Sequence, residues 1–259
     1  MKKKRSIYLA LISAATVAAI CFGTWKHISP GHLSLTMTGD SFYFTYVPPN
    51  QTTIRRNLDA FDSIDLNLSK ADIELQNGSG YSMVYRGVKE ECPSLSVKDG
   101  VLTATEPESK DSRSSDASLV LTVPKDLSKF KEISLSSGNG DITIDTGRTL
   151  NVDSLTLNSS NGDLELDRCT GKSLAASSSN GDINMEGITF ATSTLETANG
   201  DIDVNLADNI RNYTISAYTD SGETSIGDSD YDAGSIRVGS GSQKMNAQSD
   251  NGDIEIEND

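Results

Sequence analysis

The residues whose type and spacing suggest chemistry are the acids of a repeated tripeptide. Asn-Gly-Asp recurs at intervals of about 20 residues, so that its acids could stack in successive turns. Carboxylates stacked about 4.8 Å apart repel one another by roughly 1 kcal/mol in water, and a divalent cation such as Ca²⁺ would relieve this. Alternatively, each Asp accepts hydrogen bonds from turn backbone and is screened by solvent. The four most regular acids are Asp141, Asp163, Asp182 and Asp201.

Composition excludes several classes of function. The chain has 259 residues with 22 Lys and Arg against 37 Asp and Glu, a formal net charge of −15. A surface this acidic does not bind nucleic acid by neutralising phosphates. The only histidines, His27 and His32, lie near the N-terminus, which excludes His-based acid–base or zinc chemistry in the body of the chain.

An enzyme is not predicted. Carboxylate pairs of the kind that cleave glycosidic bonds are abundant, but no pair stands apart from the general acidity. We therefore expect no catalytic, cofactor-binding or metal-binding residues and no cofactor. A polysaccharide-active β-helix enzyme is the least favoured alternative.

The N-terminal 26 residues predict a membrane anchor. Lys2–Arg5 precede an uncharged run, Ile7–Trp25, whose 19 residues would span roughly 28 Å as a helix. The basic cluster predicts a cytoplasmic N-terminus and an extracytoplasmic C-terminal domain, with residues 7–25 in contact with the lipid bilayer. A signal peptide cleaved after Gly23 is the competing interpretation. A lipoprotein at Cys21 is disfavoured because Ile20 is not a small residue.

The apolar residues around each tripeptide predict strand, turn, strand. They lie six and four residues before the Asn, and three and five residues after it, which is the period-2 alternation of strands. Asn-Gly supplies two residues that tolerate positive φ at a tight turn. The full set of turns is Asn-Gly-Asp at 139–141, 161–163, 180–182, 199–201 and 251–253, and the variant Ser-Gly-Glu at 221–223.

Two architectures fit this pattern. A β-solenoid would wind each repeat into one coil, so that equivalent strands stack in parallel. An antiparallel meander would instead pair the two strands of each repeat as a hairpin. The solenoid is favoured because the turn recurs with little change, as expected if Asn139, Asn161, Asn180 and Asn199 stack in an amide ladder.

These patterns divide the chain into three parts. Residues 1–26 are the basic tail and anchor, residues 27–60 a juxtamembrane stalk with one or two strands, and residues 61–259 the repeat domain. The fold class predicted is all-β, a β-solenoid or β-helix-like domain after a single transmembrane helix.

The repeat domain resembles the bacterial putative-adhesin domain family of unknown function. The matching motifs are Ala71–Leu75, the Leu-Thr-Val-Pro-Lys of 121–125, and the repeated Ser/Asn-Gly-Asp-Ile. The resemblance implies an extracytoplasmic β-solenoid, often membrane-anchored, and provides no catalytic residues.

The two strands of each repeat predict different outer faces. After the turn the outward residues are mostly acidic, as at Glu165, Asp167 and Glu186; before it they are neutral, as at Ser134, Thr156 and Asn158. From residue 133 onward 22 acids face 6 bases. The segment Asp228–Lys244 looks like a loop insertion that could contact a partner.

Two functions remain. One is a non-catalytic binding or adhesion module of the cell envelope, with an unknown envelope protein or glycan as partner and no nucleic acid. The other is a structural or sensory component of an envelope-stress response system. Cys92 and Cys169 could form one disulfide, or remain two small thiols.

Overall fold

The computed structural model describes residues 32–38, 41–47, 51–107, 117–125 and 129–258, which form two compact units. In the first unit, β1 (His32–Thr38) pairs with β2 (Ser41–Val47) as an antiparallel ribbon. The second unit, Thr52–Asp259, contains the repeats. No helix among the described residues is long and apolar enough to cross a bilayer, and the predicted anchor at 7–25 lies outside them.

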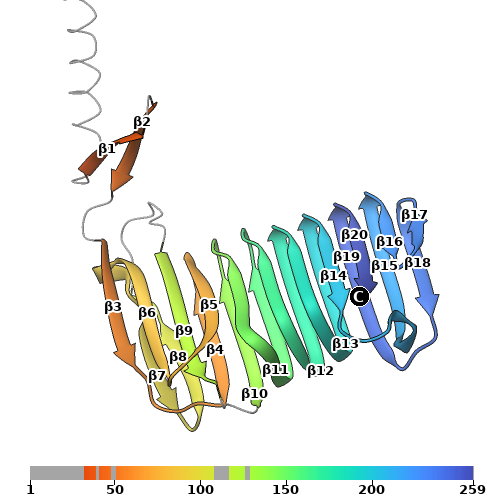
Figure 1. Ribbon diagram of the computed structural model, residues 1–259, viewed down its shortest axis with the longest axis horizontal. Helices are drawn as coiled ribbons and strands as arrows, with labels where there is room; N and C mark the ends of the chain where they lie inside the picture. Colours follow the sequence, from red (N-terminus) through yellow and green to blue (C-terminus); the bar gives the residue numbers. More distant parts are fainter. Residues whose placement is uncertain (1–31, 39–40, 48–50, 108–116, 126–128, 259) are drawn as a thin grey trace, which may run out of the picture. The chain divides into compact units, whose positions relative to one another are not determined.

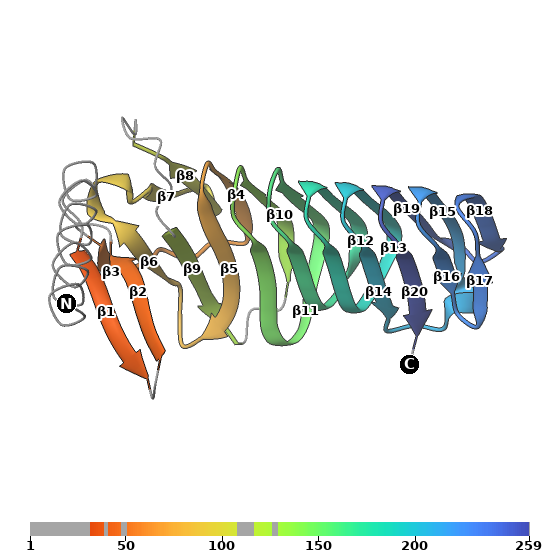
Figure 2. The ribbon, with the colours of Figure 1, turned by 90° about the horizontal axis from the view of Figure 1, so that it is seen from above.

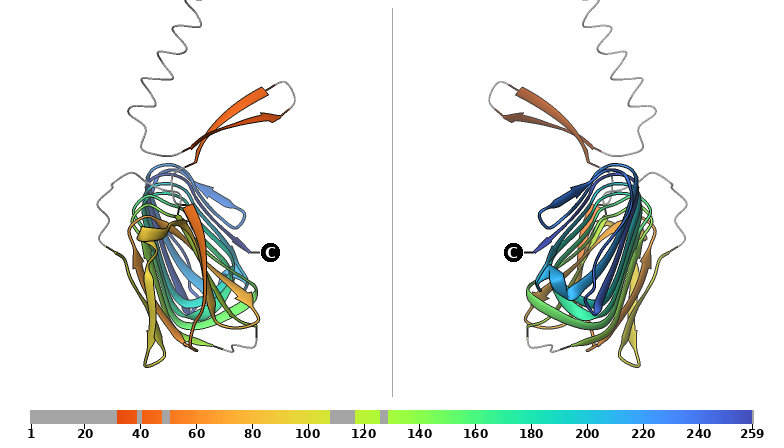
Figure 3. Two further views of the ribbon diagram at one scale, coloured as in Figure 1. Left: turned by 90° about the vertical axis from the view of Figure 1, so that its left-hand side faces the viewer. Right: turned by 90° about the vertical axis from the view of Figure 1, so that its right-hand side faces the viewer.

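The second unit consists of two sheets that close around a narrow interior (Figure 3). We name them by their position relative to the repeated tripeptide: the pre-turn sheet and the post-turn sheet. The long strands β11 (Ile142–Ser159), β12 (Leu164–Asn180) and β13 (Ile183–Asn199) bend from the post-turn sheet into the pre-turn sheet. The tripeptides therefore share one edge of the stack, the turn edge, and the bends of the long strands lie at the opposite edge.

Strand neighbours in the pre-turn sheet are given by the pairing register. In spatial order its strands are β7 (Ser94–Lys98), β8 (Val101–Thr105), β4 (Ser63–Leu68), β10 (Phe130–Ser137), the second halves of β11, β12 and β13, β19 (Gln243–Asn251), β15 (Tyr213–Ser221) and β18 (Gly234–Gly239).

The post-turn sheet runs alongside it. In spatial order its strands are β3 (Gln51–Asn57), β6 (Ser82–Val88), β9 (Ala117–Pro124), β5 (Ala71–Gly78), the first halves of β11, β12 and β13, β14 (Ile202–Leu206), β20 (Ile254–Asn258), β16 (Thr224–Ile226) and β17 (Ser229–Tyr231). Two short 3-10 helices, η1 (Lys89–Glu91) and η2 (Ile210–Asn212), lie in the connections.

The central strands are parallel in both sheets. Ile142 lies beside Leu164, and Leu164 beside Ile183, so equivalent residues of successive repeats are neighbours. The parallel stacking predicted for a solenoid is confirmed, and hairpin pairing across the Asn-Gly turns is excluded. Parallel stacking follows from the sequence because each repeat presents the same apolar residues at the same distance from its turn.

The core is one continuous column of apolar side chains. The inward positions predicted from the alternation are buried at every coil; Leu135, Leu157 and Ile183, for example, have no exposed surface. The strands that precede the first tripeptide in sequence belong to the same column, through Leu66, Leu75 and their neighbours. Stacking thus buries a continuous core that no single repeat could form alone.

The coils do not stack in the order of the sequence. The C-terminal strands β19 and β20 lie between β13/β14 and β15/β16, and they pair in parallel with both neighbours (Figures 1 and 2). The tripeptide at 251–253 is therefore inserted between the turns at 199–201 and 221–223. In a simple solenoid, successive coils would stack in the order in which they occur in the sequence. At this end of the stack they do not.

Antiparallel strands close both ends of the parallel stack. At one end β7 pairs with β8 and β6 with β9; at the other, β18 pairs with β15 and β17 with β16. Asp228–Lys244 therefore supplies two capping strands, and its interpretation as a loop insertion is wrong. Its half-buried Ile236 and Val238 pack on the core, which gives this Gly- and Ser-rich segment an apolar inner face.

Candidate binding surface

The turn edge is held by an amide ladder. From the second coil onward, the Nδ2 group of each Asn donates to Oδ1 of the Asn in the adjacent coil, at 2.9 to 3.1 Å. Asn139, the first, donates to the Ser69 carbonyl. The same Nδ2 of Asn180 also donates to the Ser160 carbonyl at 3.2 Å. The ladder predicted from the sequence is present, and it extends to the inserted coil. Its members are Asn139, Asn161, Asn180, Asn199 and Asn251.

The turn acids bind backbone. Oδ1 of Asp163 accepts the backbone N–H of Asp182 at 2.8 Å, and Oδ1 of Asp182 accepts that of Asp201 at 2.8 Å. The series begins at Asp72 and ends where Oδ1 of Asp253 accepts from Glu223 N–H. Hydrogen bonding to turn backbone, one of the two interpretations of these acids, is thus observed. Within the described residues no group of three or more His, Cys, Asp or Glu is arranged to hold a metal ion.

A third ladder, of buried hydroxyl groups, was missed from the sequence. Two residues before the first residue of each tripeptide stands a Ser or Thr whose hydroxyl donates to a backbone carbonyl of the adjacent coil, as from Ser178 to Gly162 at 3.0 Å. The acceptor is Ala71 for Ser137 and a glycine for the other members. The signal was visible, because the position is always Ser or Thr and lies on the inward side. Its members are Ser137, Ser159, Ser178, Thr197, Ser249 and Thr219.

The turn glycines are required for close stacking and not for positive φ. A Cβ atom on Gly181 would lie 2.2 Å from the carbonyl oxygen of Gly162, and the other turn glycines meet backbone at similar distances. None of them has a positive φ; Gly147, Gly187 and Arg168, at the opposite edge, do. The rationale drawn from hairpin turns was therefore wrong, although the glycines themselves were correctly singled out.

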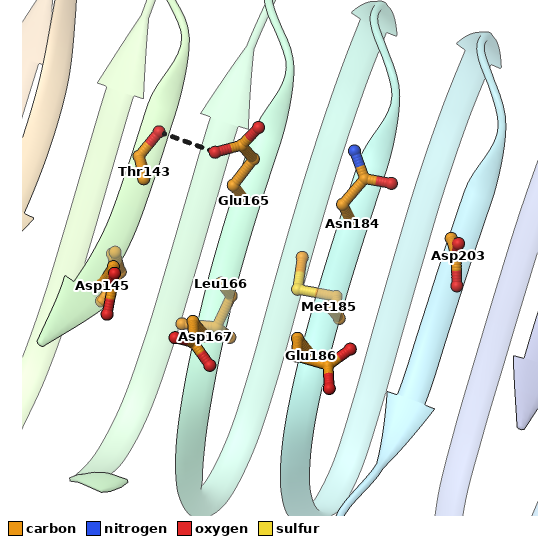
Figure 4. A pocket seen from close by; sticks show the side chains of 10 residues that line it. Thr143, Asp145, Glu165, Leu166, Asp167, Asn184, Met185, Glu186 and Asp203 are labelled. Atoms are coloured by element: carbon orange, nitrogen blue, oxygen red, sulfur yellow. Dashed lines mark hydrogen bonds between the residues drawn. The ribbon is translucent and has the colours of Figure 1, made fainter. Parts of the chain in front are cut away.

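The outer face of the post-turn sheet is acidic, as predicted. Figure 4 shows one row with Asp145, Asp167 and Glu186 and a second with Glu165 and Asp203, around a shallow depression of about 320 Å³. Burial raises the pKa of Asp167 above its ordinary value; Arg168 opposes this shift and Asp145 adds to it. Arg168 contacts the carboxylates of Asp167 at 2.5 Å and Asp145 at 3.5 Å. The outer face of the post-turn sheet therefore carries closely spaced negative charges that Arg168 neutralises only in part.

The outer face of the pre-turn sheet carries a row of polar side chains, all uncharged except Glu196, which we call the polar row. Parallel register places its members side by side, one per coil, about 4.8 Å apart. It differs from the sequence prediction by including Glu196 and Tyr218, which had not been assigned to this face. In spatial order the row is Asn67, Ser136, Asn158, Ser177, Glu196, Gln248 and Tyr218.

The polar row has two features of a binding surface. At one end, Asn67, Ser136, Asn158 and Ser177 line a depression of about 400 Å³. At the other end, Tyr218 is 37% exposed, the one large hydrophobic side chain exposed among the described residues. Amide and hydroxyl groups offer both donors and acceptors, and an exposed aromatic ring offers a flat apolar surface.

The opposite edge carries a small ion-pair cluster. Lys129 and Lys172 both contact Oδ1 of Asp153, at 2.6 and 2.8 Å. Hydrogen bonds from Lys129 and Lys172 lower the pKa of the Asp153 carboxyl below its ordinary value. The cluster lies on the surface, so its lysines are engaged with a carboxylate of the same chain and are not an open anion site.

The two cysteines of the repeat domain are free thiols. Cys169 is fully buried in the core, and burial raises its pKa to about 12. Cys92 is partly buried, and burial also raises its pKa. Of the two alternatives left open by the sequence, the structure has the unbridged one, and neither thiol is poised as a nucleophile.

This architecture is that of a known class of domain. The chain belongs to the Toastrack family, DUF4097, whose family model matches residues 61–259. The resemblance noted from the sequence motifs is thereby confirmed. No curated protein matches the chain significantly.

Solved bacterial structures are similar at low identity. One is a putative adhesin from Bacteroides fragilis, 19% identical, with a TM-score of 0.46 and coverage of 82% of this chain and 98% of that one. Another is a putative cell adhesion protein from Clostridium sporogenes, 13% identical, with a TM-score of 0.43 and coverage of 81% and 100%. A third is a putative lipid binding protein from Parabacteroides distasonis, 14% identical, with a TM-score of 0.34 and coverage of 82% and 97%.

Proposed function

We propose that this chain is a membrane-anchored, extracytoplasmic β-solenoid that acts as a non-catalytic binding module of the bacterial cell envelope. Its location is supported by the basic cluster Lys2–Arg5 before the apolar run Ile7–Trp25. Its non-catalytic role is supported by the absence of histidine after residue 32 and by the use of the turn acids as backbone acceptors.

The polar row carries the proposal. It extends across the stack from Asn67 to Tyr218, with one side chain per coil and a single charge, at Glu196. An extended ligand lying along the stack axis could contact successive coils through equivalent hydrogen bonds. A surface of amides and hydroxyls with a terminal aromatic ring suits a neutral glycan, whose hydroxyls need donors and acceptors and whose ring faces pack on aromatics.

The acidic face is the competing surface. Its carboxylates would attract a polycation and repel an anionic glycan. The polar row therefore predicts an uncharged ligand and the acidic face a cationic one, which makes the two faces separable by experiment.

The test compares two probes on the full chain reconstituted in lipid vesicles, a soluble uncharged β-glucan and polylysine. Tyr218→Ala and Gln248→Ala should weaken glucan binding together, because both remove contacts of the polar row. The matched control is Glu165→Gln with Glu255→Gln on the other face, which should weaken polylysine binding only. Glucan binding that survives both polar-row variants would contradict the proposal, as would release of reducing ends from the glucan.

The location has its own test. Protease added to intact protoplasts should remove residues 27–259 and spare the N-terminal tail. A fully protected body would contradict the extracytoplasmic assignment, and release of a native-length body into the medium would favour cleavage over anchoring.

A further inference from the structure

The β1–β2 ribbon has one face made only of apolar and aromatic residues. The two strands pair in the register that sets Leu35 beside Phe44. Because side chains alternate along a strand, residues opposite each other in this register share one face of the ribbon. The members of this face, which we call the ribbon's apolar face, are Leu33, Leu35, Met37, Phe42, Phe44 and Tyr46.

The opposite face of the ribbon is mostly polar and rich in hydroxyl groups. Neither strand contains Asp, Glu, Lys or Arg, whereas the second unit is strongly acidic. The ribbon is therefore uncharged and amphipathic, unlike the rest of the described chain. The residues of the opposite face are His32, Ser34, Thr36, Thr38, Ser41, Tyr43, Thr45 and Val47.

The apolar face needs a further apolar surface. A two-stranded ribbon is at best marginally stable in water unless a third strand or another layer packs against it. β1 and β2 form a sheet of their own, and residues 32–38 and 41–47 contain no further strand or helix that could cover the apolar face. The cover must come from outside the ribbon.

The proposed membrane anchor brings such a surface within reach. Seven residue steps lead from Trp25, the last residue of the apolar run, to His32 at the start of β1, and they extend at most about 25 Å. A strand of seven residues is about 23 Å long. A ribbon tethered this closely can lie flat on the bilayer that holds the anchor.

The chemistry of the ribbon fits the interface between lipid and water. Aromatic rings, and those of Tyr in particular, favour the headgroup level, and a ribbon without charged side chains desolvates no ion when it enters. Both outer edges of a two-stranded ribbon carry unpaired backbone N–H and C=O groups, which cannot enter the hydrocarbon core. The ribbon therefore suits a position in the plane of the interface and not across the bilayer.

We propose that the β1–β2 ribbon lies flat on the bilayer surface, with its apolar face toward the acyl chains and its opposite face toward water. The inference rests on the proposed membrane anchor and adds a second, interfacial contact to it. The ligand of the apolar face is the lipid itself. Such a contact would hold the start of the extracytoplasmic part of the chain at the membrane surface.

The test uses quenching of tryptophan fluorescence in the full chain, reconstituted in vesicles of phosphatidylcholine brominated in its acyl chains. Trp25 is the only native Trp, so Trp25→Phe provides the background for single-Trp variants. Tyr46→Trp reports on the apolar face, and Tyr43→Trp, the matched control, on the opposite face. We expect the Tyr46→Trp variant to lose most of its fluorescence and to emit at shorter wavelength, and the Tyr43→Trp variant to change little.

A second pair of variants guards against disturbance of the ribbon by one substitution. Phe44→Trp and Thr45→Trp lie on the apolar and the opposite face in the middle of β2, and they should repeat the difference. Equal quenching on the two faces in both pairs would overturn the inference. So would emission at shorter wavelength from Tyr46→Trp without quenching by lipid, because protein would then cover the apolar face.

Trp25 of the otherwise native chain reports on the anchor separately. Quenching of Trp25 without quenching of the Tyr46→Trp or Phe44→Trp variant would overturn the ribbon inference and leave the anchor standing. A native Trp25 that brominated lipid does not quench would contradict the anchor, and the ribbon inference would fail with it.

Discussion

The chain passes from one sheet to the other at both edges of the stack, but the two edges are built differently. At the turn edge, glycines allow backbones to approach closely, and Asn, Asp and a buried hydroxyl each bond to the next coil. At the opposite edge the chain bends at residues in the left-handed region, Gly147, Arg168 and Gly187. There the register shifts, as between Asp145 and Leu150.

The difference explains why one edge repeats and the other varies. A side chain at the turn edge must match the coils on both sides, so a change in one coil affects its neighbours. A bend at the opposite edge needs only a permissive φ and solvent, and it accepts connections as different as a continuous strand and the 3-10 helix η2. Repetition in this sequence marks contacts between coils, not the turn itself.

The largest expected difference in the free energy of unfolding is between variants in which one glycine at each edge is replaced by alanine. Gly181→Ala places a Cβ 2.2 Å from the Gly162 carbonyl oxygen, and neither backbone can yield without disturbing the ladders. We expect a loss of about 3 kcal/mol or more in the free energy of unfolding. Gly147→Ala meets no atom within 4 Å and has only its φ of +64° to accommodate, for about 1–2 kcal/mol. Urea titration of both variants measures the two losses in the free energy of unfolding. Equal losses would contradict the proposed difference between the two edges.

A smaller difference in the free energy of unfolding is expected between a serine of the hydroxyl ladder and a serine near the opposite edge. Ser178→Ala removes a buried donor and leaves the Gly162 carbonyl without that bond, for about 1 kcal/mol. Ser173→Ala, near the opposite edge, removes a bond to the Ser154 hydroxyl at a half-exposed position and should cost about 0.5 kcal/mol or less. If Ser173→Ala proved the more damaging in urea titration, the turn edge would not be the stabilising one.

The smallest expected changes in stability concern two acids away from the turn edge, Asp167 and Asp153. Replacing each by Asn should shift the urea midpoint at neutral pH, in opposite directions. Asp167 has a raised pKa from burial, so its contribution to stability is lost as the pH rises through that pKa. Asp167→Asn should therefore raise the urea midpoint slightly at neutral pH and not in acid.

Asp153 has a lowered pKa from Lys129 and Lys172, so its contribution is present at neutral pH and lost as the pH falls through that pKa. Asp153→Asn should lower the midpoint at neutral pH only. The same sign for both variants would contradict the assigned causes.

Much of the coil could be predicted from the sequence because it is local. The alternation around each tripeptide predicted the buried positions, and the recurrence of Asn predicted the amide ladder. The role of Gly181 was misassigned because Asn-Gly has the same letters in a hairpin, where φ matters, and in a stack, where proximity matters. Only the parallel register separates the two.

The order of the coils could not be predicted in this way. The tripeptides at 199–201 and 251–253 have the same sequence, so local pattern does not say which follows which in space. The departures at Ser221 and Glu223 were noticed as irregularities of the last coils. The coil that carries Ser221 and Glu223 lies at the end of the ladder, beyond the C-terminal coil. No further coil donates hydrogen bonds to an Asn or an Asp there, which explains why both residues differ from the repeat. The order of the polar row depends on the insertion as well, since Tyr218 and Gln248 become neighbours only through it. That Glu196 and Tyr218 point outward follows from the alternation within their own strands, and these two residues could have been predicted.

One measurement tests most directly whether the turn-edge ladders set this order. It compares disulfide formation in two variants of the full chain, Glu196→Cys with Gln248→Cys, and Glu196→Cys with Tyr218→Cys. In the inserted order Glu196 lies beside Gln248, and Gln248 separates it from Tyr218. The structure predicts a disulfide in the first variant and none in the second. A disulfide between positions 196 and 218, and none between 196 and 248, would show that the coils stack in sequence order and would contradict the account.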